Sequence, residues 1–153
     1  YGDQTYKTEP TGGKILQAVS TNYTTLTTNT STSFNTSMAV TITPASTSND
    51  ILVIFTTQLS KDSGTGDSNV RIYRVVSASI AATRTITDMY FRNAVGTCST
   101  CAGQWLDSPS TTSAITYQFA FNSTDGAQDI HINNWNSSGD NVGSQITAME
   151  IAG

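Results

Sequence analysis

The 153-residue chain predicts an all-β domain, a two-sheet antiparallel sandwich of jelly-roll-like type with about eight strands. Three observations predict it. Short runs of alternating apolar and polar residues recur, turn-forming residues separate these runs, and no window shows the 3.6-residue apolar spacing of a helix. Ser and Thr are abundant, and their hydroxyl groups suit the half-solvated outer face of a sheet.

The clearest strand pattern covers residues 115–122. Apolar side chains at every second position predict one inward face, formed by Ile115, Tyr117, Phe119 and Phe121. The continuous apolar run Ile51–Phe55 instead predicts a central strand that is buried on both faces. The remaining strands are expected at residues 15–21, 24–32, 38–42, 70–76, 89–92, 130–133 and 145–151, with a short helical turn within 77–87.

The two ends of the chain differ in character. Residues 1–13 are polar and end in Pro-Thr-Gly-Gly, which is typical of an arm or linker that enters a domain. The jelly-roll-like domain is therefore expected to cover residues 14–153. The last expected strand runs almost to the C-terminal residue, which predicts that this end is paired within a sheet.

Charge and composition argue against several functional classes. The net charge is −4 with only seven Lys and Arg, whereas nucleic-acid binding needs a clustered basic face. No apolar run approaches the length of about 18 residues that crosses a membrane. The few acidic residues lie mostly in expected loops, which does not favour the paired carboxylates of a glycosidase. We therefore expect no enzyme, no cofactor, no metal, no nucleic-acid partner and no membrane insertion.

Cys98 and Cys101 are the only cysteines and form a C-x-x-C pattern. The βαβ context of a redox pair is missing, and a zinc site would need two further ligands in a chain with one histidine. A local disulfide is the favoured prediction, because the ends of a tight turn approach within about 7 Å. Two free thiols are the alternative.

A candidate ligand-binding cluster surrounds Trp135, formed with Asn133, Asn134 and Asn136. An exposed aromatic ring can stack on a sugar while amides bond its hydroxyl groups. The alternative is that Trp135 covers one end of the sandwich or a subunit contact.

Three other features have simpler interpretations. His131 alternates with two isoleucines and is expected to face outward. Asp62 and Asp67 flank a Gly-containing loop, which could hold calcium but lacks the full ligand pattern, so a plain loop is expected. Trp105 precedes a turn and is expected to pack in the core or at an interface.

Several segments, in this order, resemble a known family. They are Gly12–Val19, Val40–Pro44, Asn49–Val53, Trp105–Pro109, Thr111–Ser113 with Tyr117, and Ile146–Ile151. Residues 12–153 resemble jelly-roll domains of aquatic bacteriophage virion proteins, many of them tail-fibre-like. The pattern consists of turns and strands, carries no catalytic signature, and includes neither the cysteine pair nor residues 1–11.

The resemblance implies a homotrimeric domain on the surface of a virus particle, outside the cell, that attaches to a host-surface glycan or protein or to other virion proteins. Leu26 and Phe34 are apolar residues on otherwise polar segments and are candidates for the trimer contacts. The alternatives are a capsid decoration or head-fibre protein, and a secreted carbohydrate-binding module.

Overall fold

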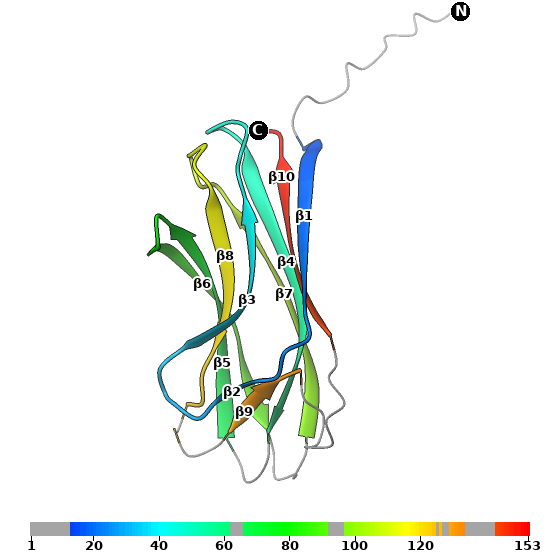
Figure 1. Ribbon diagram of the computed structural model, residues 1–153, viewed down its shortest axis with the longest axis vertical. Helices are drawn as coiled ribbons and strands as arrows, with labels where there is room; N and C mark the ends of the chain where they lie inside the picture. Colours follow the sequence, from blue (N-terminus) through cyan, green and yellow to red (C-terminus); the bar gives the residue numbers. More distant parts are fainter. Residues whose placement is uncertain (1–12, 62–65, 92–96, 125, 127–128, 134–142) are drawn as a thin grey trace, which may run out of the picture.

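A computed structural model describes residues 13–61, 66–91, 97–124, 126, 129–133 and 143–153. These residues form an all-β, jelly-roll-like sandwich of two antiparallel sheets, as the sequence predicts (Figure 1). None of them form a helix that could cross a membrane. The strands are β1 (Ile15–Tyr23), β2 (Thr27–Asn29), β3 (Asn35–Ile42), β4 (Asp50–Lys61), β5 (Gly66–Val76), β6 (Ser79–Phe91), β7 (Thr97–Asp107), β8 (Ile115–Phe121), β9 (Ile130–Ile132) and β10 (Ser144–Ile151).

β4 lies at the centre of the six-stranded sheet. On one side it pairs along its length with β7, from Ile51 opposite Asp107 to Lys61 opposite Thr97. On the other side it pairs first with β10 and then with β9, which are flanked in turn by β1 and β2. The four-stranded sheet has the order β3-β8-β5-β6. In Figure 1 the two sheets face each other, with β2 and β9 at the lower end and the C-terminus beside β1 at the upper end.

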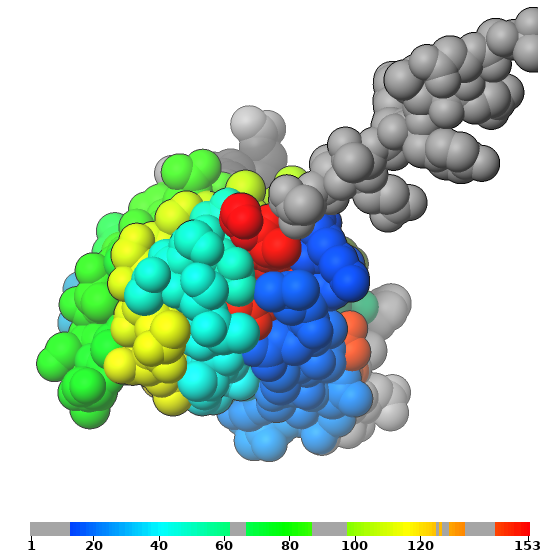
Figure 2. Space-filling model, turned by 90° about the horizontal axis from the view of Figure 1, so that it is seen from above, coloured from blue at the N-terminus to red at the C-terminus, as the bar shows by residue number. Residues whose placement is uncertain are grey.

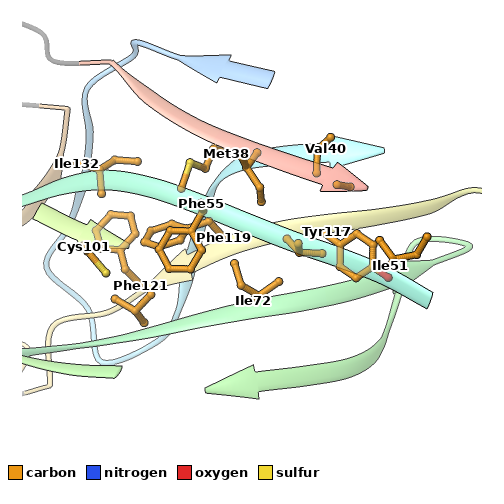
Figure 3. Close-up of a cluster of buried hydrophobic side chains, with 14 of the residues drawn as sticks. Met38, Val40, Ile51, Phe55, Ile72, Cys101, Tyr117, Phe119, Phe121 and Ile132 are labelled. Atoms are coloured by element: carbon orange, nitrogen blue, oxygen red, sulfur yellow. The ribbon is translucent and has the colours of Figure 1, made fainter. Parts of the chain in front are cut away.

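The core fills the space between the sheets (Figure 3). The predicted inward face of β8 is confirmed, since all four of its large side chains are 0% exposed. The ring of Phe55 from β4 lies 5.1 Å from that of Phe119, and Phe119 lies 6.2 Å from Phe121. Burying each such ring contributes on the order of 1.5–3 kcal/mol, so these contacts hold the sheets together.

Two strands were not predicted correctly from the sequence. Residues 77–87 form no helical turn: Ser77 and Ala78 make a tight turn with φ of 50° and 63°, and β6 begins directly after it. Hairpin turns with positive φ usually carry Asn and Gly. Because Ser and Ala occupy these positions here, the sequence gives no signal for the turn. β7 was missed because its segment around Cys101 is rich in small residues and contains Gly103.

The prediction for Ile51–Phe55 is half right. The segment belongs to a central strand, because β4 has partners on both sides. Only alternate residues are buried, however: Ile51, Val53 and Phe55 enter the core, while Leu52 is half-buried and Ile54 is 37% exposed. No described residue forms a layer that covers this outer face of the sheet.

Gly103 is required where β7 packs against β6. A Cβ atom at this position would lie 2.6 Å from Ile86 Cγ2 and 2.8 Å from Phe55 Cε1. We expect Gly103→Ala to lower the free energy of unfolding by about 1–3 kcal/mol, because both neighbours must shift. Urea denaturation followed by circular dichroism measures the loss. Ala102→Ser, on the exposed side of the same strand, is the control and should stay within about 0.5 kcal/mol of the wild type. An unchanged midpoint for Gly103→Ala would contradict the close approach of β6 and β7.

Candidate functional site

Of the four residues in the predicted ligand-binding cluster, only Asn133 lies among the described residues. Asn133 is fully buried and has a positive φ of 61°. Its amide nitrogen donates to the carbonyl oxygens of Tyr23 and Thr25, and its oxygen accepts from Ser144. Asn133 therefore ties the end of β1 to β10 and presents no free amide to a ligand. Trp135, Asn134 and Asn136 lie outside the described residues.

The expected disulfide between Cys98 and Cys101 is not formed, and both cysteines are free. They lie three positions apart on the extended strand β7, which separates their Cα atoms by about 10 Å, beyond the reach of a disulfide. Burial raises the pKa of the Cys101 thiol to about 11 and also raises the pKa of Cys98. Both thiols are therefore protonated at neutral pH, which does not suit a nucleophile or a metal ligand.

Ile130 and Ile132 enter the core and His131 does not, as alternation predicts, but the expectation that His131 faces solvent is wrong, because its side chain is only 6% exposed. β9 is paired on both sides, with β2 and with β4, and His131 Nδ1 lies 2.8 Å from Thr28 Oγ1. Of the loop acids, Asp62 lies outside the described residues, and Asp67 receives a hydrogen bond from Thr124 at its backbone oxygen. Within the described ranges, no three His, Cys, Asp or Glu side chains come together as metal ligands would.

A buried polar cluster joins the two sheets. Asp107 at the end of β7 accepts hydrogen bonds from Arg74 Nη1 of β5, at 2.9 and 3.0 Å, and from the hydroxyl of Tyr117 of β8, at 2.7 Å. Burial, followed by the hydrogen bond to Asp107, raises the pKa of the Tyr117 hydroxyl far above its ordinary value. Trp105 packs edge-on against the Tyr117 ring at 5.8 Å, as its predicted packing role implies. The cluster is saturated internally, which is the arrangement of a structural tie.

A second buried acid, Glu150 of β10, fixes the end of the sandwich where the chain terminates. Its carboxylate accepts from Asn49 Nδ2, Ala45 N and Gln17 Nε2, each at 2.6 Å. Burial works to raise its pKa, but hydrogen bonds from Asn49, Gln17 and the backbone at Ala45 and Ser46 outweigh it and lower the pKa. Figure 2 looks onto this end, where the C-terminal residues (red) lie between the segment before β4 (cyan) and the start of β1 (blue).

The outer face of the four-stranded sheet, here named the hydroxyl face, is mainly polar. Across β3, β8, β5 and β6 its rows include Thr41–Thr116–Val75–Ile80, Ala39–Gln118–Tyr73–Thr83 and Thr36–Ala120–Arg71–Thr85, and Ile80 is 59% exposed. Thr41 and Thr116 are hydrogen-bonded through their hydroxyl groups at 2.9 Å. Phe34, a predicted contact residue, packs 6.3 Å from the Tyr73 ring with the Arg71 guanidinium 3.9 Å above it, while Leu26 is 44% exposed.

The outer face of the six-stranded sheet carries more large apolar side chains. We name the outward-facing residues of β7, β4, β10 and β1 the open face. Its rows from β7 to β1 are Leu106–Leu52–Met149–Ala18, Gln104–Ile54–Thr147–Ser20 and Ala102–Thr56–Gln145–Asn22, with Asp50–Ile151–Ile15 at the upper end. Leu106 is 59% exposed and Ile15 is 55% exposed, and Leu16 lies exposed in the bulge beside Ile15. Large apolar side chains are thus more numerous on this outer face, whereas Ile80 is the large aliphatic side chain exposed in the described rows of the hydroxyl face.

Two shallow cavities hollow the β4–β7 half of the open face. One, of about 310 Å3, is lined by Leu52, Arg84, Gln104, Trp105 and Leu106. The other, of about 290 Å3, shares Gln104 and is lined further by Ile54, Phe55, Thr56, Ala102 and Gly103. Their linings combine apolar side chains with Arg84, Gln104 and Thr56, and no described residue of either lining is acidic.

Comparison with known proteins gives a fold likeness and no family. No protein-family model matches the chain, and no curated protein matches it. Solved structures that resemble it include three of infectious bursal disease virus. They are the T13 viral particle, the VP2 subviral particle and the Gt strain, each 10% identical to this chain. The matches cover 88%, 88% and 90% of this chain and 37%, 38% and 40% of the viral chains, in that order. The TM-scores are 0.47, 0.48 and 0.47. The chain spans well under half the length of these viral proteins.

Sequence reasoning missed the open face, the cavities and the two buried acids. One signal for the open face was present: the run Ile51–Phe55 has no polar alternation, although no layer formed by the described part of the chain covers one side of β4. The roles of Asp107 and Glu150 gave no local signal, because the partners of Asp107 lie 10 and 33 positions away in sequence and those of Glu150 lie 101–133 positions away.

Proposed function

We propose that this domain is a virion structural module that attaches by surface complementarity and performs no catalysis. Its place would be the surface of a virus particle, as a tail-fibre or adhesin-type homotrimer that contacts the host surface. The observation that carries the proposal is the contrast between the open face and the hydroxyl face. A module held in an assembly needs one adhesive side and one side that remains solvated.

Two further features support this proposal. The segment order of residues 12–153 resembles that of jelly-roll domains in bacteriophage virion proteins. In addition, the buried acids Asp107 and Glu150 have their carboxylate oxygens engaged by side chains and backbone of the same chain. Such acids stabilise a rigid scaffold, whereas a catalytic acid has to reach a substrate.

A capsid decoration or head-fibre protein would use the same surfaces, but it would bind the capsid lattice instead of a receptor. Immunogold electron microscopy separates the two. Antibodies against the purified domain should label intact particles at fibres or spikes, and antibody pre-absorbed with the domain should not. Label spread evenly over the capsid would indicate a decoration protein instead of an adhesin. Particles without label, in preparations where the domain is detected outside them, would contradict a virion role.

A further inference from the structure

We infer that the open face is the surface through which one copy of this chain packs against a second copy. The inference rests on the proposed function, because it names the surface through which copies of the proposed module would associate. It commits to a copy of the chain as occupant, with host glycans and other virion proteins as outcomes of the test.

The first argument is the composition of β4. A continuous apolar strand is typical of a sheet that is covered on both faces. Among the described residues only one face of β4 is covered, and Leu52 and Ile54 point to the other side. Leu106 on β7 and Met149 on β10 extend this apolar surface to both neighbouring strands. A second layer over the open face would give this segment the environment that its sequence indicates.

The second argument is electrostatic. The chain carries a net charge of −4, so two copies repel each other in most orientations. The open face is an exception: its rows contain one charged residue, Asp50, and Arg84 contributes a cation at the β7 margin. The face is therefore neutral within an acidic chain. Self-association through it brings together the two regions that repel least, with one acid and one base available to pair between copies.

The third argument is size and shape. Four strands spaced about 4.8 Å apart and eight residues long, at about 3.3 Å per residue, give a projected face of roughly 500 Å2. This matches the lower limit of a specific interface, about 1,000 Å2 summed over two partners. The two cavities of about 310 and 290 Å3 along β4 and β7 would receive side chains of the neighbouring copy. Inserted side chains in such cavities commonly dominate the binding energy.

Sedimentation velocity of the full chain at about 50 µM tests the inference, since weak homomeric contacts have dissociation constants in the micromolar range. The wild type is expected to sediment as an oligomer, and Ile54→Lys as a monomer. Lysine at the centre of the interface would weaken association by at least about 100-fold, because its charge would be buried without a partner. Ile54 is 37% exposed and points outward, so the monomer should fold.

Thr41→Lys on the hydroxyl face is the matched control and should leave the oligomer intact. Leu106→Glu provides a second disruption with the opposite charge, and circular dichroism melting confirms that each variant is folded.

A monomeric wild type, or an oligomer that both open-face variants leave unchanged, would overturn the inference. So would a monomer that binds immobilised glycans through Ile54. The antibody labelling of particles is independent of these outcomes, so the virion role and the interface can fail separately. A dimer dissociated by Ile54→Lys would uphold the surface and refute the trimer.

Discussion

Replacing Asp107 with alanine is expected to lower the free energy of unfolding by about 3 kcal/mol, the largest single effect we predict. The substitution leaves the Arg74 guanidinium, 18% exposed, without its anion and the buried Tyr117 hydroxyl without its acceptor. Removing one partner of a buried ion pair generally costs about 3–5 kcal/mol, and the partial exposure of Arg74 places the effect at the lower end. Urea denaturation at pH 7, with circular dichroism as the signal, measures the loss.

Tyr117→Phe is the matched control for this prediction. It removes one hydrogen bond to a charged group and keeps the ion pair between Arg74 and Asp107, so a loss of about 1.5 kcal/mol is expected. The ranking of the two variants is the informative result. An Asp107→Ala protein within about 1 kcal/mol of the wild type would show that the cluster does not tie the two sheets together.

Replacing Glu150 with alanine is expected to cost nearly as much, about 2–3 kcal/mol at pH 7. Three donors, from Gln17, Ala45 and Asn49, would lose a fully buried acceptor. Glu150→Gln keeps the shape and one oxygen and should lose about half as much. The same urea titrations apply, and a Glu150→Ala variant as stable as Glu150→Gln would contradict the role of the carboxylate as a common acceptor.

The Glu150 contribution should also depend on pH. Its pKa is lower in the folded protein than its ordinary value of 4.5, so folding favours the ionised form. The stabilisation is therefore complete above about pH 5 and is lost as the pH falls below 4.5 and through the folded pKa. The stability difference between wild type and Glu150→Gln should shrink between pH 6 and about pH 3. Because the other acids are common to both proteins, their titration cancels in this difference.

The parts of the fold that follow from local pattern were predictable. The alternation in residues 115–121 identified the inward face of β8, and the apolar run Ile51–Phe55 identified the central strand. β6 and β7 were not predictable in this way. The turn at Ser77 and Ala78 lacks the glycine or asparagine that usually marks positive φ, and Gly103 interrupts the apolar pattern of β7.

The functional surfaces were harder to predict, because they depend on pairing between distant segments. Alternation placed His131 opposite the core-facing Ile130 and Ile132, but it could not show that this other face of β9 is buried as well. Asn133 looked like part of a polar loop, yet its left-handed backbone turns its amide into the fold. The open face emerges only when β7, β4, β10 and β1 are aligned in register, which no single segment encodes.

Electron cryo-microscopy of the particle that carries this chain, at a resolution that separates subunits, tests the central claim most directly. We expect the sandwich on the particle surface in clusters of three. Leu52, Ile54 and Leu106 should face neighbouring copies, and the hydroxyl face should be turned to solvent. A particle without this domain, or copies whose open face is fully exposed to solvent, would contradict the account.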